Sequence, residues 1–328
     1  MAKRSIMAFE ERWPIRGSFR ISRGAKTNAD VVVVEITEEG ITGRGECVPY
    51  PRYGESPSTV LDEISKIKDA VTHGAGRFDL LTLLPSGAAR NAIDCALWDL
   101  EAKLTGRTVS DLAGIPEPGP LITAYTLSLD TPAKMGIAAE NNAYRPLIKL
   151  KLAGDGDIER VTAVRKAAPK TRLIVDANEG WNAYMMESYF PVMADLGVEL
   201  IEQPLPAGQD NGLGEMAHPV AICADESCHD TSTLDQVAAN YDYINIKLDK
   251  TGGLTEALLM AEAARDFGLG IMVGCMLGTS LGMAPAMLLG GFARFVDLDG
   301  PLLLEKDRPN GIQFDASVMH PATSELWG

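Results

Sequence analysis

The sequence predicts an α/β fold, a modified TIM barrel of the (β/α)7β type with an α+β capping domain. The first observation is a series of short apolar segments in the middle of the chain, each ending in one charged residue. These charged residues are Lys151, Asp176, Glu202, Asp225 and Lys247. They are separated by 25, 26, 23 and 22 residues, which is about the length of one strand–helix unit. The second observation is that the preceding part of the chain does not follow this repeat.

The first 115 residues instead predict strands followed by helices, the order that is typical of a small α+β domain. The turn Glu38-Glu39-Gly40 joins two apolar runs, and helical periodicity follows in two later segments. We expect strands at residues 5–11, 31–36 and 41–48, a long loop at residues 13–30, and helices at residues 58–71 and 88–104. A run rich in proline and glycine then marks the end of this domain, residues 1–115.

The repeat extends on both sides of the five charged residues and gives eight strands, the number in a closed barrel. We expect this barrel domain to span residues 116–300 and the tail, residues 301–328, to fold back onto the capping domain. The expected strands lie near residues 121–129, 147–152, 172–177, 199–204, 221–225, 243–248, 270–275 and 293–298. Catalytic groups of such barrels lie at the C-terminal strand ends, where the charged residues fall.

Composition and charge exclude some kinds of partner. The formal net charge of −15 leaves no basic stripe to neutralise phosphates, so nucleic acid is not expected as a partner. No run approaches the ~20 apolar residues that a membrane-spanning helix needs, so no membrane association is expected. The N-terminal segment has no apolar secretory core, and the five cysteines are scattered, so we expect a cytoplasmic protein. The oligomeric state stays open, a homo-oligomer included.

Three carboxylates end consecutive strands and predict a metal site. Asp176, Glu202 and Asp225 would repel one another at the barrel mouth unless a cation neutralised them. Ligands that are all carboxylate oxygens suit Mg²⁺, and we expect one Mg²⁺ per active site. Any one of these residues alone could instead cap the helix that follows it. Three in succession, flanked by lysines, favour the metal.

Three lysines flank the carboxylates. Lys149 and Lys151 alternate with apolar residues, so both point to the barrel interior, and Lys247 arrives from the far side. Mutual repulsion and a nearby metal are expected to lower a lysine pKa toward the working pH. Lys151 and Lys247 could then move a proton on opposite faces of one carbon. Lys149 and Mg²⁺ would stabilise the enolate that forms.

These motifs resemble the muconate-lactonising subgroup of the enolase superfamily, over essentially the whole chain. The matching segments are Lys149-x-Lys151, Asp176-Ala-Asn178, Glu202-Gln203-Pro204, Ala224-Asp225-Glu226-Ser227, Asn245-Ile246-Lys247, Lys250-Thr251-Gly252-Gly253 and, in the first domain, Gly43-Arg44-Gly45-Glu46. The resemblance implies that the three carboxylates bind the metal and that the two outer lysines are the acid–base groups.

Within that subgroup, the motif Asp297-x-Asp299 after the eighth strand resembles the signature of dipeptide epimerases. The resemblance implies that both carboxylates receive the free ammonium group of a dipeptide. Strand alternation would place Asp297 and Asp299 on one face. Asp299 alone, before a glycine, could instead be a turn residue.

The first domain adds cationic residues that would cover the barrel mouth. Arg23 is the expected partner of a glutamate side chain in the substrate, with Lys26 and Arg52 as alternates; solvated loop charges are the other interpretation. The surrounding pattern is similar to bacterial epimerases that act on L-Ala-D-Glu and L-Ala-L-Glu. The resemblance implies a Mg²⁺-dependent isomerase that moves the α-proton of the C-terminal residue, in murein peptide metabolism.

Other functions compete with this one. A cycloisomerase, an o-succinylbenzoate synthase or an N-acylamino-acid racemase would use the same barrel, but their substrates lack a free ammonium group and leave Asp297 and Asp299 without a role. A metal-dependent binding protein on a decayed barrel is the non-enzymatic alternative, and the presence of all five charged residues of the series argues against it. Breadth of dipeptide specificity, and which lysine acts on which epimer, stay open.

Overall fold

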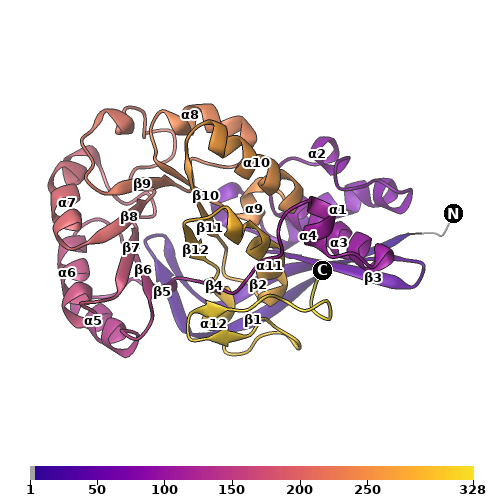
Figure 1. Cartoon of the computed structure of the whole chain (residues 1–328), viewed down its shortest axis with the longest axis horizontal. Helices are drawn as coiled ribbons and strands as arrows, with labels where there is room; N and C mark the ends of the chain where they lie inside the picture. The colour runs from indigo at the N-terminus through magenta and orange to yellow at the C-terminus, as the bar shows by residue number, and fades with distance from the viewer. Residues whose placement is uncertain (1–3) are drawn as a thin grey trace.

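The computed structural model describes residues 4–328. It contains a barrel of parallel strands and, beside it, a second body of antiparallel strands and helices (Figure 1). The mixed α/β architecture predicted from the repeat is confirmed. In this described part of the chain, no helix is long and apolar enough to cross a membrane.

The capping body is built on a three-stranded antiparallel sheet in the order β1-β2-β3, with helices packed on it. Its elements are β1 (Ser5–Ile21), β2 (Gly24–Glu38), β3 (Ile41–Cys47), η1 (Pro51–Tyr53), α1 (Pro57–Thr72), α2 (Leu80–Leu83), α3 (Ala88–Thr105) and α4 (Val109–Ala113). Helix α3 lies very close to β3, because glycines form the contact. A Cβ atom on Gly45 would lie 2.1 Å from Ala92 O. The two predicted helices are confirmed.

The long loop predicted for residues 13–30 is wrong. These residues continue β1 and β2 into a long hairpin, paired from Ser5–Thr37 to Ile21–Gly24 with one irregularity between Pro14 and Phe19. Beyond Ile15 most side chains of β1 are exposed. A strand without a buried face lacks the apolar alternation by which a strand is recognised in a sequence.

The barrel is an eight-stranded parallel sheet in the order β5 to β12, counted over residues 4–328. Its strands are β5 (Tyr125–Leu127), β6 (Leu147–Lys151), β7 (Arg172–Asp176), β8 (Val198–Glu202), β9 (Ala221–Ala224), β10 (Tyr243–Ile246), β11 (Gly270–Gly274) and β12 (Phe295–Asp297). Ala124 N donates a hydrogen bond of 2.7 Å to Val296 O, so the first and last strands lie side by side. All eight strands occur within the predicted segments, give or take one residue.

The first predicted barrel strand is split. Residues 121–129 contain β4 (Leu121–Ile122) and β5, and only β5 belongs to the barrel. β4 pairs with the tail strand β14 (Val318–Met319), which in turn pairs with β13 (Phe314–Asp315). The split reflects a partner that lies almost 200 residues later in the chain, which local periodicity does not reveal.

Helices connect most barrel strands and cover the outside of the barrel (Figure 1). They are α5 (Pro132–Asn141), α6 (Asp157–Ala167), α7 (Ala183–Asp195), α8 (Leu234–Ala238), α9 (Leu248–Thr251), α10 (Leu254–Asp266), α11 (Ser280–Met287) and α12 (Gly300–Leu303), with short turns η2 (Leu213–Glu215), η3 (Thr231–Thr233) and η4 (Leu288–Gly291). Between β8 and β9 only η2 occurs in the described chain, so this connection lacks a full helix.

The end of the chain contacts the capping body. The Trp327 indole donates a 2.9 Å hydrogen bond to Cys95 O in α3, and the Arg44 guanidinium donates to the carbonyl oxygens of Glu325 and Leu326. Trp327 is buried. These contacts connect the last residues of the chain to both β3 and α3.

The interior of the barrel has two different ends. Side chains from the strand starts form a small apolar cluster whose buried members are Ala124, Leu147, Ile174, Leu200, Cys223, Met272 and Phe295. The opposite ends of the same strands carry buried charged residues. Among the described residues of the barrel strands, buried charge therefore lies at the C-terminal ends, whereas charged residues near the strand starts, such as Arg172 and Glu199, are at least partly exposed.

Candidate active site

The strand ends carry the predicted charged residues to one place. Lys151, Asp176 and Glu202 are the last residues of β6, β7 and β8, and Asp225 and Lys247 follow β9 and β10 directly. All five are at most 8% exposed. Because β6 and β10 are four places apart in the order of eight strands, their lysines face each other across the barrel.

Lys149 lies at the centre of the charged cluster. Its Nζ atom is 2.5 Å from Glu202 Oε2, 2.7 Å from Asp297 Oδ2 and 3.3 Å from Asp176 Oδ2. The side chain is 1% exposed. One ammonium group therefore contacts three carboxylates and offsets at most one of their three negative charges.

The two outer lysines each contact a different carboxylate. Lys151 Nζ donates a 2.6 Å hydrogen bond to Asp176 Oδ2, and Lys247 Nζ donates one of 2.6 Å to Asp225 Oδ2. Both lysines also line a common cavity. A molecule in that cavity would have one ammonium or amine group on each side.

Ion pairs in the folded chain raise the pKa of Lys149 and that of Lys247. The lowering expected beside a bound metal ion stays a prediction. Burial alone would lower the pKa of each group, but the surrounding carboxylates outweigh it and raise both pKa values well above the usual range. For Lys149 the largest opposing contribution comes from Asp297, and for Lys247 from Asp225. Direct ion pairs with the carboxylates thus outweigh repulsion between the lysines.

The three expected metal ligands differ in their electrostatic state. Burial would raise the pKa of Asp176, but Lys151 and Lys149 hold it at about 2. Burial and the Asp176 charge raise the pKa of Glu202. Glu202 Oε2 is buried and accepts no hydrogen bond from the described residues, although it forms the ion pair with Lys149. The charged form of Glu202 is therefore less favoured than that of Asp176.

The donor set fits a hard divalent cation in its chemistry. It consists of three buried carboxylates, and the oxygen of Glu202 without a hydrogen bond is the kind of group that a cation would satisfy. In the present arrangement, residues 4–328 hold no group of three Asp, Glu, His or Cys side chains positioned to share one ion. Lysine ammonium groups lie between the carboxylates instead. The ligand roles of Asp176, Glu202 and Asp225 therefore stay a prediction.

A cavity of about 420 Å³ lies over this cluster, at the C-terminal ends of the strands. Its wall combines the barrel mouth with the tip of the β1–β2 hairpin and the segment after β3. The predicted site residues in its wall are Lys151, Asp225, Lys247, Asp297, Asp299, Arg23, Lys26 and Arg52. Thr126, Met276 and Leu277 also contribute to the wall.

Asp297 and Asp299 both reach the cavity, but not as strand neighbours. β12 ends at Asp297, and Asp299 is the residue that precedes α12, so strand alternation does not explain their common direction. Thr126 of β5 holds the pair, since its backbone N donates 2.6 Å to Asp299 Oδ2 and its hydroxyl donates 3.4 Å to Asp297 Oδ1. Burial and the neighbouring Asp297 raise the pKa of Asp299 to about 7.

The cationic residues at the hairpin tip are not equivalent. Arg23 lies 2.7 Å from Glu226 and 3.1 Å from Glu179, and Arg52 lies 2.9 Å from the same Glu179. Lys26 forms no ion pair with a described residue and lies 5.5 Å from the centre of the Tyr50 ring. Lys26 is therefore the cation of this group that is available to a ligand.

Sequence reasoning gave no role to several residues of the site. Glu179 and Glu226 directly follow the motif residues Asn178 and Asp225. Glu179 pairs with Arg23 and Arg52, and Glu226 pairs with Arg23. Their positions beside known motif residues were the available signal. Their partner Arg23 comes from the β1–β2 hairpin, whose extent the sequence did not reveal, and Arg52 comes from η1 after β3.

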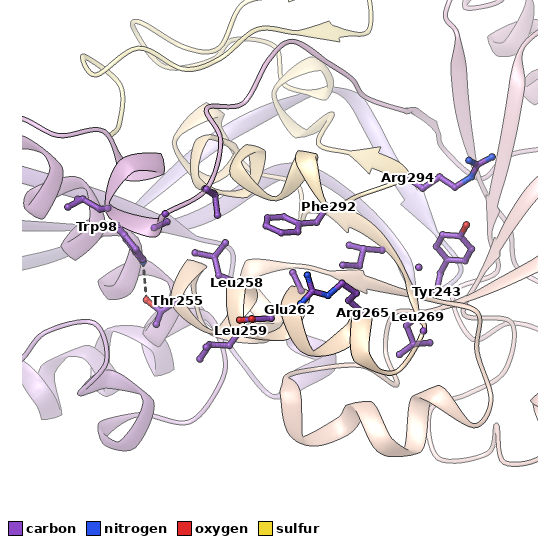
Figure 2. A pocket seen from close by; sticks show the side chains of 18 of the residues that line it. Trp98, Tyr243, Thr255, Leu258, Leu259, Glu262, Arg265, Leu269, Phe292 and Arg294 are labelled. Carbon is purple, nitrogen blue, oxygen red and sulfur yellow. Dashed lines mark hydrogen bonds between the residues drawn. The ribbon is translucent and has the colours of Figure 1, made fainter.

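A larger groove, of about 1100 Å³, lies elsewhere, where α10 meets α3 and the starts of β10 and β11 (Figure 2). Figure 2 shows Trp98 bonded to Thr255 at one end and Tyr243 and Arg294 at the other; the Trp98–Thr255 distance is 2.9 Å. None of the predicted site residues, all of which lie within residues 4–328, lines this groove.

Comparisons with known proteins agree with the geometry. A family model described as "Enolase C-terminal domain-like" matches residues 135–315. A second one, described as "Mandelate racemase / muconate lactonizing enzyme, N-terminal domain", matches residues 3–114.

Related proteins match over nearly the full length. An L-Ala-D/L-Glu epimerase of Escherichia coli (strain K12) is 47% identical, covering 97% of this chain and 99% of the relative. An N-acetyl-D-glutamate racemase of Pseudoalteromonas sp. is 45% identical, covering 91% and 95%.

Solved structures match equally well. An enolase family member from Agrobacterium tumefaciens with homology to dipeptide epimerases, with bound sodium and L-Ala-L-Glu, superimposes with a TM-score of 0.97 at 53% identity, over 99% of this chain and 100% of that one. A dipeptide epimerase from Enterococcus faecalis V583, complexed with Mg and L-Leu-L-Tyr, gives 0.91 at 28% identity, over 99% of each chain. The chain therefore belongs to the mandelate racemase/muconate lactonizing family of the enolase superfamily.

Proposed function

We propose that this protein is a dipeptide epimerase, an isomerase that inverts the α-carbon of a C-terminal residue, chiefly in L-Ala-L-Glu and L-Ala-D-Glu. The observation that carries the proposal is the pairing of two features in one cavity. Lys151 and Lys247 face each other across it, and Asp297 and Asp299 form an anionic wall. The first feature suits proton transfer on two faces, and the second suits a free ammonium group.

The two lysines would act in turn. One takes the α-proton as a neutral amine, and the other returns a proton to the opposite face as an ammonium group. Each must first leave its carboxylate, Asp176 for Lys151 and Asp225 for Lys247. With Asp176 and Asp225 engaged by a bound cation, the lysines would lose these ion pairs, and the nearby positive charge would lower their pKa values toward the neutral amine.

Mg²⁺ is the cofactor that the donor set fits, and we propose one ion per site, held by Asp176, Glu202 and Asp225. When bound, it would stabilise the negative charge that develops on the substrate carboxylate as the α-proton leaves. Lys149 lies among these residues and would donate to the same carboxylate. Its buried ammonium group is already oriented, so little reorganisation is needed.

The ammonium group of the substrate would lie between Asp297 and Asp299. Thr126 fixes both carboxylates, so the site is organised before the substrate arrives. A dipeptide carries this ammonium group, whereas an N-acylated amino acid does not. The wall therefore favours a dipeptide over an acylated amino acid.

A glutamate side chain would be recognised under the hairpin tip. Lys26 is the cation free of ion pairs with described residues, while Arg23 and Arg52 must release Glu179 before they can bind a substrate. We propose Lys26 as the primary contact, with Arg23 and Arg52 completing the cationic pocket. The names of two relatives, an L-Ala-D/L-Glu epimerase and an N-acetyl-D-glutamate racemase, both refer to glutamate, which agrees with this recognition.

Racemisation of an N-acylated glutamate is the second candidate. The 45% identity to an N-acetyl-D-glutamate racemase favours it, since that substrate shares the carboxylates but has no ammonium group. The buried pair Asp297 and Asp299 opposes it, because an acyl group in contact with two carboxylates would leave their charge unbalanced.

The biological setting and domain division are proposals of the same kind. Since D-Glu linked to L-Ala occurs in peptidoglycan stem peptides, we propose a cytoplasmic role in the reuse of such peptides. We also retain residues 1–115 with the tail 301–328 as the capping domain and residues 116–300 as the barrel domain. The bond from Trp327 to Cys95 supports the grouping of tail and cap.

The test is a comparison of three substrates. The purified protein with MgCl2 is incubated with L-Ala-L-Glu, L-Ala-D-Glu and N-acetyl-D-glutamate, and each product is resolved by chiral chromatography. Both dipeptides should approach the same mixture of epimers, with N-acetyl-D-glutamate much slower. Faster turnover of N-acetyl-D-glutamate would replace this proposal by the second candidate, and no turnover of any of the three would refute both.

A further inference from the structure

A fully buried lysine lies behind the expected metal ligands and outside the cavity. Lys250 belongs to α9 and is 1% exposed. Its Nζ donates 2.6 Å to Asp225 O, 2.6 Å to Asp225 Oδ1 and 3.0 Å to Asn245 O. An ammonium group has three hydrogens, so all of its donors are used.

Two lysines therefore hold the two oxygens of one carboxylate. Lys247 donates to Asp225 Oδ2, and Lys250 donates to Asp225 Oδ1. Within the described chain, the cavity wall includes Lys247 and does not include Lys250. Lys247 can thus exchange Asp225 for a ligand, whereas Lys250 has no ligand to reach.

The backbone fixes Lys250 in this direction. α9 is a single turn that ends at Gly252 (φ +77°) and Gly253 (φ +112°), backbone conformations that favour glycine. A Cβ atom on Gly252 would lie 2.3 Å from Arg90 Nε. The glycine pair allows the chain to end α9 in one turn, and Lys250 on that turn contacts Asp225, the residue after β9.

Through Asn245, Lys250 is also linked to Glu202, a second expected metal ligand. Asn245, whose carbonyl oxygen accepts from Lys250, donates its side-chain amide to Glu202 Oε1 at 2.8 Å. On the other side of Asp225, Gln203 Oε1 accepts from Asp225 N at 2.8 Å. The backbone of Asp225 is therefore fixed at both its N–H and its carbonyl group.

We infer that Lys250 is a positioning residue that holds Asp225 in place to receive the divalent cation when Lys247 turns to the substrate. The inference rests on the proposed metal site of the epimerase. Groups behind metal ligands orient them, and loss of such a group typically weakens metal binding about 10- to 100-fold.

Charge alone would give the opposite result. Lys250 places a positive charge beside a ligand of a cation, so its removal would strengthen metal binding if only Coulomb repulsion mattered. If anchoring dominates, its removal weakens binding. The direction of the change in Mg²⁺ affinity therefore separates the two effects.

The experiment is calorimetric titration of the full-length protein with MgCl2, without substrate, for the wild type and the variants Lys250→Gln, Lys250→Met, Lys250→Arg and Lys247→Gln. Loss of the anchor in Lys250→Gln and Lys250→Met should raise the Mg²⁺ dissociation constant about 10- to 100-fold. Lys250→Arg keeps charge and donors and should recover much of the affinity. Lys247→Gln should bind Mg²⁺ at least as tightly as the wild type and lose epimerisation. At saturating Mg²⁺, Lys250→Gln should regain much of its kcat, which a misfolded variant would not.

Each other outcome overturns the inference, and thermal unfolding of each variant identifies a failure to fold. Unchanged or tighter Mg²⁺ binding by folded Lys250→Gln would contradict anchoring. Should that variant not fold, the Mg²⁺ dissociation constant of folded Lys250→Arg decides. A rise of about 10- to 100-fold above the wild-type value would contradict the inference as well. A wild type that epimerises dipeptides without binding Mg²⁺ would refute the metal site and this inference, while leaving the epimerase activity standing.

Discussion

The cavity at the barrel mouth and the groove along α10 differ in how deeply their charged lining residues are buried. The cavity at the barrel mouth, about 420 Å³, is lined by charged residues such as Lys151, Lys247 and Asp297, each at most 8% exposed. The groove along α10 is larger, about 1100 Å³, but its charged residues, such as Glu262 and Arg265, are exposed on the helix surface (Figure 2). Buried charge is costly and exposed charge is not, so burial of charge, rather than volume, identifies the site.

The two ends of the barrel interior show the same contrast between apolar and buried charged residues within single strands. β6 begins with Leu147 in the apolar cluster and ends with Lys151 at the cavity. β8 likewise contributes Leu200 to the apolar cluster and ends with the buried Glu202. The same strands thus supply packing at one end and reactive groups at the other. Substitutions at the mouth should change activity, and substitutions in the groove should not.

The largest effect is expected from the two facing lysines. Lys151→Ala and Lys247→Ala should each lower kcat for epimerisation about 10³-fold or more, because each removes a proton-transfer group. The rates are measured from both epimers of L-Ala-Glu. A variant that retains more than about a tenth of wild-type kcat would contradict the proposal that the facing lysines of the cavity, unlike the groove residues, transfer the proton.

A smaller loss is expected at the anionic wall. Asp297→Asn should lower kcat/KM for L-Ala-L-Glu about 30- to 1000-fold, because the ammonium group loses a buried partner charge. Turnover of N-acetyl-D-glutamate, measured in parallel, should fall much less, since that molecule has no ammonium group. Equal losses for both substrates would show that Asp297 acts through Lys149 instead.

The pH dependence of kcat/KM should reflect the protonation of Asp299, the second carboxylate of the anionic wall. Burial and Asp297 raise the pKa of Asp299 to about 7, so as the pH falls through this value the carboxylate takes up a proton and its negative charge is lost. The kcat/KM for L-Ala-L-Glu should therefore decrease toward acid. Asp299→Asn should have a low kcat/KM that no longer shows this decrease. An unchanged acid limb in the variant would assign it to another group.

A moderate effect is expected at the hairpin tip. Lys26→Met should raise KM for L-Ala-L-Glu about tenfold or more with little change in kcat, because it removes a charge-assisted hydrogen bond to the glutamate side chain. L-Ala-L-Met, which lacks that carboxylate, is the matched substrate and should be unaffected. If Arg23→Met rather than Lys26→Met gave this pattern, the arginine would be the primary contact.

The smallest effect is expected in the α10 groove. Glu262→Gln and Leu259→Ser should each leave kcat/KM within about twofold of the wild type, since exposed positions far from the chemistry rarely matter more. The same assay measures both. A loss comparable to that of Lys26→Met would mean that this groove communicates with the cavity.

Much of the fold was predictable from the sequence because the barrel strands are buried on both faces. Their apolar runs and regular spacing located all eight. The hairpin was not predictable, since residues 16–26 lie mostly exposed and carry no alternating pattern. The pairing of β4 with β14 was not predictable either, because it depends on a contact across the chain.

The sequence predicted which charged residues meet at the barrel mouth, but not all of the contacts between them. Lys151, Asp176 and Glu202 end their strands as the spacing required. The raised pKa values of Lys149 and Lys247 depend on ion pairs that only the folded chain creates. The same holds for the engagement of Arg23 by Glu179 and Glu226, whose partners lie far away in the sequence.

The most direct test of the central claim is exchange of the substrate α-proton in heavy water, followed by NMR, with MgCl2. The wild type should incorporate deuterium at the α-carbon of the glutamate in both L-Ala-L-Glu and L-Ala-D-Glu. Lys151→Ala and Lys247→Ala should each abolish incorporation from a different epimer, because the lysines lie on opposite sides of the cavity. Equal exchange of both epimers by either variant would contradict the two-lysine account.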